Sequence, residues 1–181
     1  MTKQVRWITE TAVMLALLVT LQAVTKGFGQ LVTGSFVNAI LAVTVLVSGL
    51  SSGITVALIS PILAFLLGIA PQILTVPAIM VGNTIYVVLL YLIAGKESKH
   101  IFRQIAGWVV SAVAKFGALY AIVVVIICNF MAPSLMVAGL LKKPMLTALP
   151  ATFSWPQLFT ALIGGGVALC IVPILRKALH K

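Results

Sequence analysis

The chain alternates between long apolar runs and short breaks that are rich in glycine, proline or charged residues. Six apolar segments can be delimited, at about residues 7–25, 36–50, 53–69, 73–94, 105–130 and 156–175. A helix of roughly 20 apolar residues crosses the hydrocarbon core of a bilayer. The pattern therefore predicts an all-α integral membrane protein, a six-transmembrane-helix bundle formed by a single membrane domain over residues 1–181.

The composition supports a membrane environment. Hydrophobic residues make up 62% of the chain and charged residues 8%, whereas soluble domains carry roughly 25% charged residues. The first apolar run is longer than the apolar core of a signal peptide, about 7–15 residues. We therefore expect it to be a retained first helix.

The charge distribution predicts the orientation. Twelve Lys and Arg oppose two acidic residues, Glu10 and Glu97. With both termini cytoplasmic, the inner connections and tails hold eight Lys/Arg and the outer loops three, as the positive-inside rule requires. Because the basic residues lie near helix ends and form no continuous face, we expect no nucleic-acid partner. The prediction is a multi-pass protein of a prokaryotic plasma membrane, surrounded by lipid.

The outer connections differ from ordinary solvated tethers. The first, "TKGFGQLVTGSF", is rich in glycine, and residues 131–155 remain half apolar. Apolar loops with many Gly and Pro residues, placed over a helical bundle, indicate a lidded pocket that opens to the outside.

Lys115 lies about ten residues into the fifth apolar segment. A lysine at the centre of a membrane helix costs roughly 2.5–3.5 kcal/mol, so it is expected to face the bundle interior or a watery cavity. The alternative is that its side chain snorkels to the interface. No acidic residue lies at a similar depth, so a substrate oxygen, carbonyl groups or water must satisfy the ammonium, or the amine is neutral.

The candidate substrate-binding residues combine this lysine with amide and aromatic side chains of the outer half. Each amide can instead be a hydrogen bond between helices, and the aromatic residues can instead form an interfacial belt. The set is Lys115, Asn83, Asn38, Gln72, Tyr86, Tyr120, Phe36, Trp155 and Gln157.

Signatures of enzymes and metal sites are missing from the sequence. The predicted interior contains no pair of carboxylates, and His100 and His180 lie on the presumed cytoplasmic side. Cys128 and Cys170 sit in apolar runs without metal-ligand spacing. The "GGG" at residues 164–166 has no phosphate-binding context and indicates close helix packing. We expect no catalytic residue, no metal and no cofactor.

Three functions are compatible with a small bundle of this kind. A self-sufficient carrier or channel would be expected to show acids at membrane depth or an inverted repeat, and neither is visible. A structural or assembly protein would not need Lys115 or a lidded outer face. A substrate-binding membrane subunit that is powered by other chains fits both features.

Three segments of the sequence resemble those of a known family of membrane proteins. They are the small pair Ala12 and Ala16 in "TAVMLALLVT", the run "LVTGSFVNAILAVTVLVSGLSSGITVALISPILAFLLGI", and "SWPQLFTALIGG" at the start of the last segment. With six predicted spans, the chain resembles the S component, the substrate-binding membrane subunit, of an energy-coupling factor (ECF) transporter. The resemblance covers nearly the whole chain.

The resemblance implies a function and partners. S components bind a vitamin or similar micronutrient at the outer side of the membrane. They deliver it with a transmembrane coupling subunit and two cytoplasmic ATPase subunits, as part of an ABC transporter. The resemblance assigns Ala12 and Ala16 to the contact with the coupling subunit. The segments "GSFVNAIL" and "SWPQL" are similar to a cobalamin-binding subgroup, and pantothenate and folate are the alternatives.

Overall fold

The computed structural model describes residues 2–69, 72–95 and 100–178. Helices account for nearly all of these residues, and no strand occurs among them, which confirms the all-α prediction. In chain order they are α1 (Lys3–Thr25), η1 (Lys26–Phe28), α2 (Gln30–Val47), α3 (Leu50–Leu66), η2 (Ile73–Thr75), α4 (Val76–Ala94), α5 (Ile101–Leu119), η3 (Tyr120–Phe130), α6 (Ala132–Val137), α7 (Met145–Phe153) and α8 (Trp155–Ala178). The segments η1 and η2 are single 3₁₀ turns, and η3 is π-helical.

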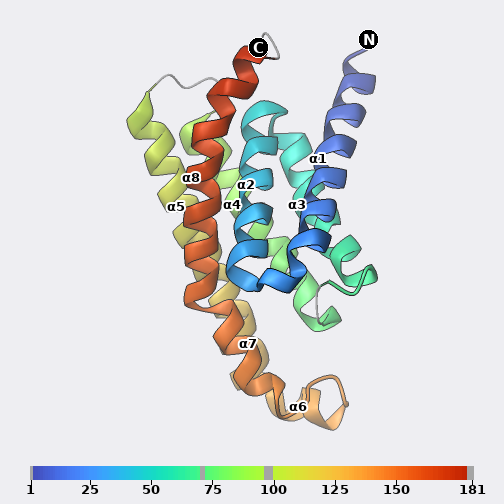
Figure 1. Cartoon of the computed structure of the whole chain (residues 1–181). Coiled ribbons are helices and arrows are strands. Elements are labelled where there is room, and N and C mark those ends of the chain that lie inside the picture. Colours follow the sequence, from blue (N-terminus) through green and yellow to red (C-terminus); the bar gives the residue numbers. More distant parts are fainter. Residues whose placement is uncertain (1, 70–71, 96–99, 179–181) are drawn as a thin grey trace.

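Five helical stretches in the described part of the chain are long and apolar enough to cross a membrane: Lys3–Phe28, Gln30–Val47, Ile73–Ala94, Ile101–Phe130 and Met145–Ala178. The apolar helix α3 has 17 residues and is therefore about 25 Å long, slightly short of a hydrocarbon core of about 30 Å. The start of α1 and the end of α8 lie at the same end of the bundle (Figure 1). The sixth crossing and the cytoplasmic side of both termini remain predictions.

The largest departures from the predicted segments are at two places, both in the connections that were predicted to lie on the outer side. Helix α2 begins at Gln30, six residues before the predicted boundary at 36. Gly29, with φ of 85°, makes the turn into it, and the Thr33 hydroxyl donates to the Thr25 carbonyl (2.8 Å), which ties α2 to the end of α1. The glycine-rich stretch is therefore mostly the first turns of a helix.

The half-apolar stretch 131–155 folds into α6 and α7. Together with η3, these helices form a lobe that projects beyond the rest of the bundle, at the end away from the termini (Figure 1); we call it the outer lobe after the predicted orientation. Its apolar residues, among them Leu135, Leu141 and Leu149, are buried with Val123 and Ile127 in a second hydrophobic cluster. Burial of these side chains explains why the stretch is too apolar for a solvated loop.

Helix α2 forms the centre of the bundle. All ten residues from Asn38 to Val47 are buried, and α1, α3, α4 and α8 pack around it. The chain reverses from α2 into α3 at Gly49, whose φ is 104°. A helix that is apolar on every side has no polar face to turn toward water, which fits the central position of α2 among the other helices.

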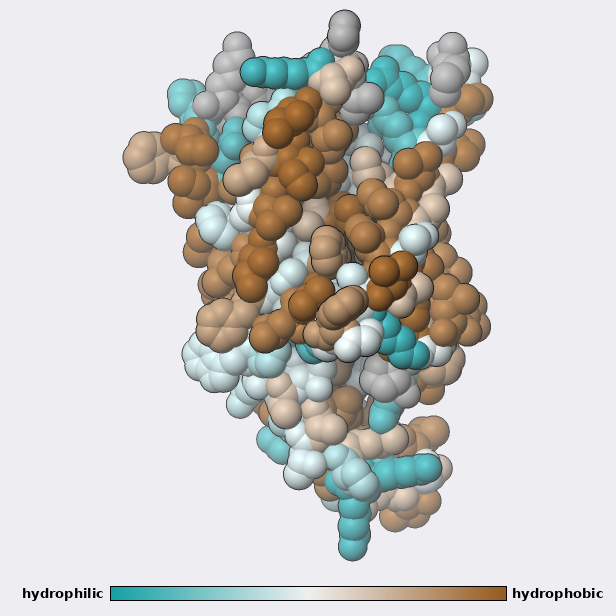
Figure 2. Space-filling view, in the orientation of Figure 1, coloured by the Kyte–Doolittle hydropathy of each residue, from teal (hydrophilic) through white to brown (hydrophobic). Residues whose placement is uncertain are grey.

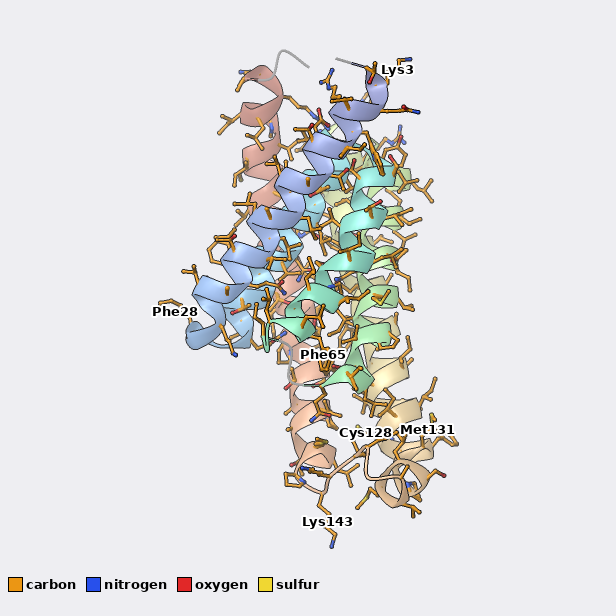
Figure 3. All side chains as sticks on the ribbon, turned by 90° about the vertical axis from the view of Figure 1, so that its right-hand side faces the viewer. Lys3, Phe28, Phe65, Cys128, Met131 and Lys143 are labelled. Atoms are coloured by element: carbon orange, nitrogen blue, oxygen red, sulfur yellow. The ribbon has the colours of Figure 1, made fainter. Side chains whose placement is uncertain are left out.

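The surface matches this arrangement. Figure 2 shows hydrophobic residues over the middle of the bundle, with hydrophilic residues at the end that carries the termini and at the tip of the outer lobe. Lys3 and Lys143 mark these two opposite ends (Figure 3). An apolar band between two polar ends is the surface that a bilayer requires.

Adjacent glycines in α8 allow two helices to approach it closely. A Cβ atom on Gly164 would lie 2.3 Å from the Ser35 carbonyl oxygen and 2.7 Å from the Ala39 nitrogen, both in α2. A Cβ atom on Gly165 would lie 2.2 Å from Trp108 Cδ1 in α5. The prediction that "GGG" is a packing signal agrees with these contacts, since small residues permit such close approach in membrane bundles.

We predict that Gly164→Ala destabilises the protein by about 1–3 kcal/mol, because the new methyl group overlaps backbone atoms of α2 that cannot rotate away. Thermal unfolding of the purified protein in detergent, followed by tryptophan fluorescence, measures this loss. Gly117→Ala in α5 is the control, since its Cβ would meet no atom within 4 Å. Equal stability of the two variants would contradict the packing role of Gly164.

Candidate functional site

Lys115 is the centre of a buried polar group in the bundle. Its side chain is 3% exposed. The Nζ atom donates to Asn38 Oδ1 at 2.6 Å and to Asn83 Oδ1 at 2.7 Å. It also lies 5.5 Å from the centroid of the Tyr86 ring, within the range of a cation–π interaction. Three helices, α5, α2 and α4, therefore meet at one ammonium group.

The helical period explains why Lys115 points inward. The buried residues of α5 are Gly107, Ser111, Ala112, Lys115 and Leu119, which recur every three or four positions and share one face. The Lys115 side chain therefore faces the bundle interior and does not snorkel to the interface.

Close packing of α4 on α5 places Asn83 beside Lys115. The residue before it, Gly82, faces Leu119, and a Cβ atom on Gly82 would lie 2.8 Å from Leu119 Cγ. The absent side chain brings the two backbones together at this level. Asn83 is itself 1% exposed.

Asn38 is held by its own hydrogen bonds. Its Nδ2 atom donates to the Gly34 carbonyl at 2.9 Å and to Thr160 Oγ1 of α8 at 3.3 Å. The Thr160 hydroxyl donates in turn to the Gln157 carbonyl at 3.0 Å. Every polar atom of the Asn38 side chain thus has a partner, and its oxygen is fixed toward Lys115.

A cavity of about 330 Å³ lies against this polar group. Most of its lining residues come from the last turns of α1 and α3 and the first turns of α2, α4 and α8, so it lies toward the end of the bundle away from the termini. Residues of α1, α2, α3, α4, α5, α7 and α8, and one residue that follows α3, line it. They are Gln22, Gln30, Thr33, Gly34, Val37, Asn38, Ala64, Ile69, Ile79, Asn83, Lys115, Thr152, Phe153 and Gln157. A concave, mostly preformed site with a few convergent polar groups is typical of small-molecule binding.

The electrostatics of the site are one-sided. Among the residues that the structure describes, Glu10 is the acidic side chain, and it pairs with Arg6 at 2.9 Å in the first turns of α1, at the other end of the bundle. Over the same ranges, no group of three His, Cys, Asp or Glu residues is placed to hold a metal ion. The site can therefore bind through hydrogen bonds and, when Lys115 is protonated, through its positive charge.

The structure brings four of the predicted binding residues to the cavity: Lys115, Asn83, Asn38 and Gln157. Tyr86 lies beside Lys115 but does not line the cavity. The aromatic ring of Tyr86 is fully buried, and among the described residues its hydroxyl has no hydrogen-bond partner.

The other predicted binding residues do not line the cavity. Phe36, Tyr120 and Trp155 are 39%, 42% and 63% exposed. Trp155 stacks on Phe116 with centroids 5.6 Å apart, and Phe116 also contacts Tyr120. This exposed aromatic group fits the alternative given in the sequence analysis, in which the aromatic residues form an interfacial belt. Gln72 lies just before η2, outside the lining residues.

Ten lining residues were not among the predicted binding residues, and five of these carry a polar or aromatic side chain: Gln22, Gln30, Thr33, Thr152 and Phe153. Four of these five fall in or next to the two outer connections that the sequence marked as unusual. The composition of these two connections therefore indicated where the cavity would lie, but it did not indicate which individual side chains would line it.

Ala12 and Ala16 are exposed on α1, on the face that points away from the bundle. The opposite face of α1 carries the buried residues Thr11 and Leu18. The Thr11 hydroxyl bonds to Ser52 Oγ of α3 at 2.9 Å. Because both alanines are exposed, packing within the described bundle does not explain the small pair, and its role in partner binding remains a prediction.

Comparison with known proteins gives one finding. The family model described as "ECF transporter, substrate-specific component" matches residues 6–176. This range runs from the first turn of α1 into the last turns of α8 and contains every residue that lines the cavity. No curated protein and no solved structure matches the chain.

We predict that Asn38→Leu destabilises the protein by about 1–3 kcal/mol, because the buried ammonium of Lys115 loses one of its two acceptors. Thermal unfolding in detergent measures the change. Asn129→Leu is the matched control, since Asn129 is exposed near the end of η3 and should tolerate the same substitution. A neutral effect of Asn38→Leu would contradict the structural importance of the polar group.

Proposed function

Because the chain belongs to the family of ECF transporter substrate-specific components, we propose that it captures a vitamin or similar micronutrient at the outer face of a prokaryotic plasma membrane. The observation that carries the proposal is the cavity whose polar wall is Lys115 with Asn38 and Asn83. A buried lysine costs several kcal/mol in a membrane protein and is retained where it serves a site.

The energy for uptake comes from partner chains in this proposal. The family implies association with a transmembrane coupling subunit and ATPase subunits, and we assign ATP hydrolysis to two cytoplasmic ATPases. The chain itself acts as a binding and delivery subunit, not as an enzyme. Its cavity lies away from the end that carries both termini, which fits substrate entry from outside if the termini are cytoplasmic.

The substrate proposed from the sequence is cobalamin, with pantothenate and folate as alternatives. Amide side chains such as Asn38, Asn83 and Gln157 suit the amide arms of a corrinoid. The lysine suits the carboxylate of pantothenate or folate equally well. Family membership is compatible with all three vitamins.

Docking on the coupling subunit is assigned to the exposed face of α1 around Ala12 and Ala16. Two small residues one helical turn apart allow another backbone to approach closely, and such packing drives helix association in lipid. This face and the cavity use different residues, so binding and docking can be separated by mutation.

Vitamin binding tests the proposed function directly. We expect one B vitamin from a panel that includes cobalamin, pantothenate and folate to raise the thermal midpoint of the purified protein, since a ligand that binds only the folded state stabilises it. Isothermal titration calorimetry then gives the affinity. If no vitamin in the panel shifts the midpoint, the proposed function is wrong.

Docking is tested with Ala12→Trp combined with Ala16→Trp. We expect vitamin binding to be unchanged, whereas co-purification with the coupling subunit and uptake into cells are lost, because the indoles block close approach. Ile105→Trp with Val109→Trp is the matched control, since these residues are also four positions apart and exposed, but on α5. Full uptake by the α1 variant would rule out this docking face.

A further inference from the structure

At the polar wall of the cavity, the described partners of the Lys115 amine are neutral amide oxygens, and Asn83 Nδ2 has no hydrogen-bond partner among the described residues. We infer that the substrate is a small molecule with a carboxylate, and that this carboxylate binds between Lys115 Nζ and Asn83 Nδ2. The inference rests on the proposed function, because it concerns the substrate of the same cavity, and it selects the carboxylate alternatives over the cobalamin that the sequence resemblance favours.

The first donor is the lysine. An ammonium group carries three N–H donors, and in the described residues two amide oxygens, of Asn38 and Asn83, accept from it. Both partners are neutral, so they provide hydrogen bonds without an opposite charge. Because Lys115 lines the cavity, a third acceptor can come from a bound ligand.

The second donor is the amide nitrogen of Asn83. Asn83 is 1% exposed and lines the cavity, and within the described ranges its Nδ2 atom has no hydrogen-bond partner. The amide cannot be turned around, because the ammonium of Lys115 only donates and must face Oδ1. A buried donor left without a partner costs about 1–3 kcal/mol, so an acceptor from the ligand is expected there.

A carboxylate satisfies both donors at once. It has two acceptor oxygens, one for Nζ and one for Nδ2, and its single negative charge balances the single lysine. The acid Glu10 is engaged by Arg6 near the termini. A phosphate ester would bring up to two negative charges to one cation, and a neutral carbonyl would leave the charge uncompensated.

The other lining residues and the volume of the cavity indicate what the rest of the substrate must look like. Gln22 presents a buried Oε1 atom that no described residue satisfies, so the ligand should carry a hydroxyl or amide donor toward α1. Val37, Ile79 and Phe153 also line the cavity and offer apolar contacts to the rest of the substrate. The cavity of about 330 Å³ is at the small end of ligand pockets, roughly 300–1,000 Å³. This size favours a compact carboxylate vitamin such as pantothenate over a corrinoid.

Matched pairs of an acid and its neutral analogue test the inference. Calorimetry on the full chain in detergent compares pantothenate with panthenol, nicotinate with nicotinamide, biotin with biotinamide, and folate with its dimethyl ester. Cyanocobalamin, riboflavin, thiamine and pyridoxal phosphate complete the set. We expect at least one acid to bind about 100-fold more tightly than its neutral analogue, because a desolvated charge pair is lost in the analogue.

Other results overturn the inference in distinguishable ways. Preferential binding of cyanocobalamin, riboflavin, thiamine or pyridoxal phosphate, or equal affinity for an acid and its neutral analogue, refutes the carboxylate and leaves the proposed function standing. Absence of binding by every compound refutes both.

Two variants locate the carboxylate, using the acid that binds. Asn83→Asp places a carboxylate of the protein itself beside Lys115 and removes only an Nδ2 atom that has no partner. We expect the thermal midpoint without ligand to stay the same or rise, and the affinity for the acid to fall about 100-fold. Asn129→Asp, the same change at an exposed position, should leave the affinity unaltered.

Lys115→Gln provides the second measurement. We expect it to reduce the preference for the acid over its neutral analogue to nearly one, whereas Lys143→Gln in the outer lobe keeps the full preference. Unchanged affinity of Asn83→Asp for the acid, or an unchanged preference in Lys115→Gln, would show that the carboxylate does not bind at this position.

Discussion

The ammonium of Lys115 can be buried in this bundle only because amide oxygens from two other helices converge on it. Asn38 and Asn83 lie 77 and 32 residues away in the chain, so their meeting depends on the rotation and spacing of α2, α4 and α5. Close packing sets that spacing: Gly82 lets α4 approach α5, and Gly164 lets α8 approach α2 next to Asn38. Lipid offers no substitute partner for a polar group, so the helix packing and the polar group stabilise each other.

The same arrangement leaves two polar atoms at the cavity without a partner among the described residues. They are Asn83 Nδ2 and Gln22 Oε1, which are both buried, and both residues line the cavity. A bundle selected for stability alone would fill these positions with apolar side chains. Proteins tend to violate the rules of packing and hydrogen bonding where they bind something. The unmet groups therefore support a binding role independently of family membership.

In the proposed function, substrate recognition and partner docking use separate parts of the molecule. The cavity lies among helices that surround α2, and the small pair Ala12 and Ala16 faces outward on α1. Helix α1 contributes to both regions, since Gln22 lines the cavity and Ala12 and Ala16 lie earlier in the same helix. The bond from Thr11 to Ser52 ties this part of α1 to α3. A subunit that hands its substrate to a separate transport machinery needs both surfaces, and here one helix contributes to each.

The sequence by itself determined the membrane class, the helical segments and the interior position of Lys115, because hydropathy and the cost of a lysine in lipid are properties of local composition. It also marked both outer connections as unusual, although residues 30–35 proved helical and 131–155 folded into α6 and α7. It could not separate Asn38 and Gln157, which line the cavity, from Phe36, Tyr120 and Trp155, which do not. Polar and aromatic residues near helix ends have the same local pattern whether they face a cavity or the interface. Only the tertiary structure decided this, because the direction of each side chain depends on how its helix is rotated against neighbours that are distant in the sequence.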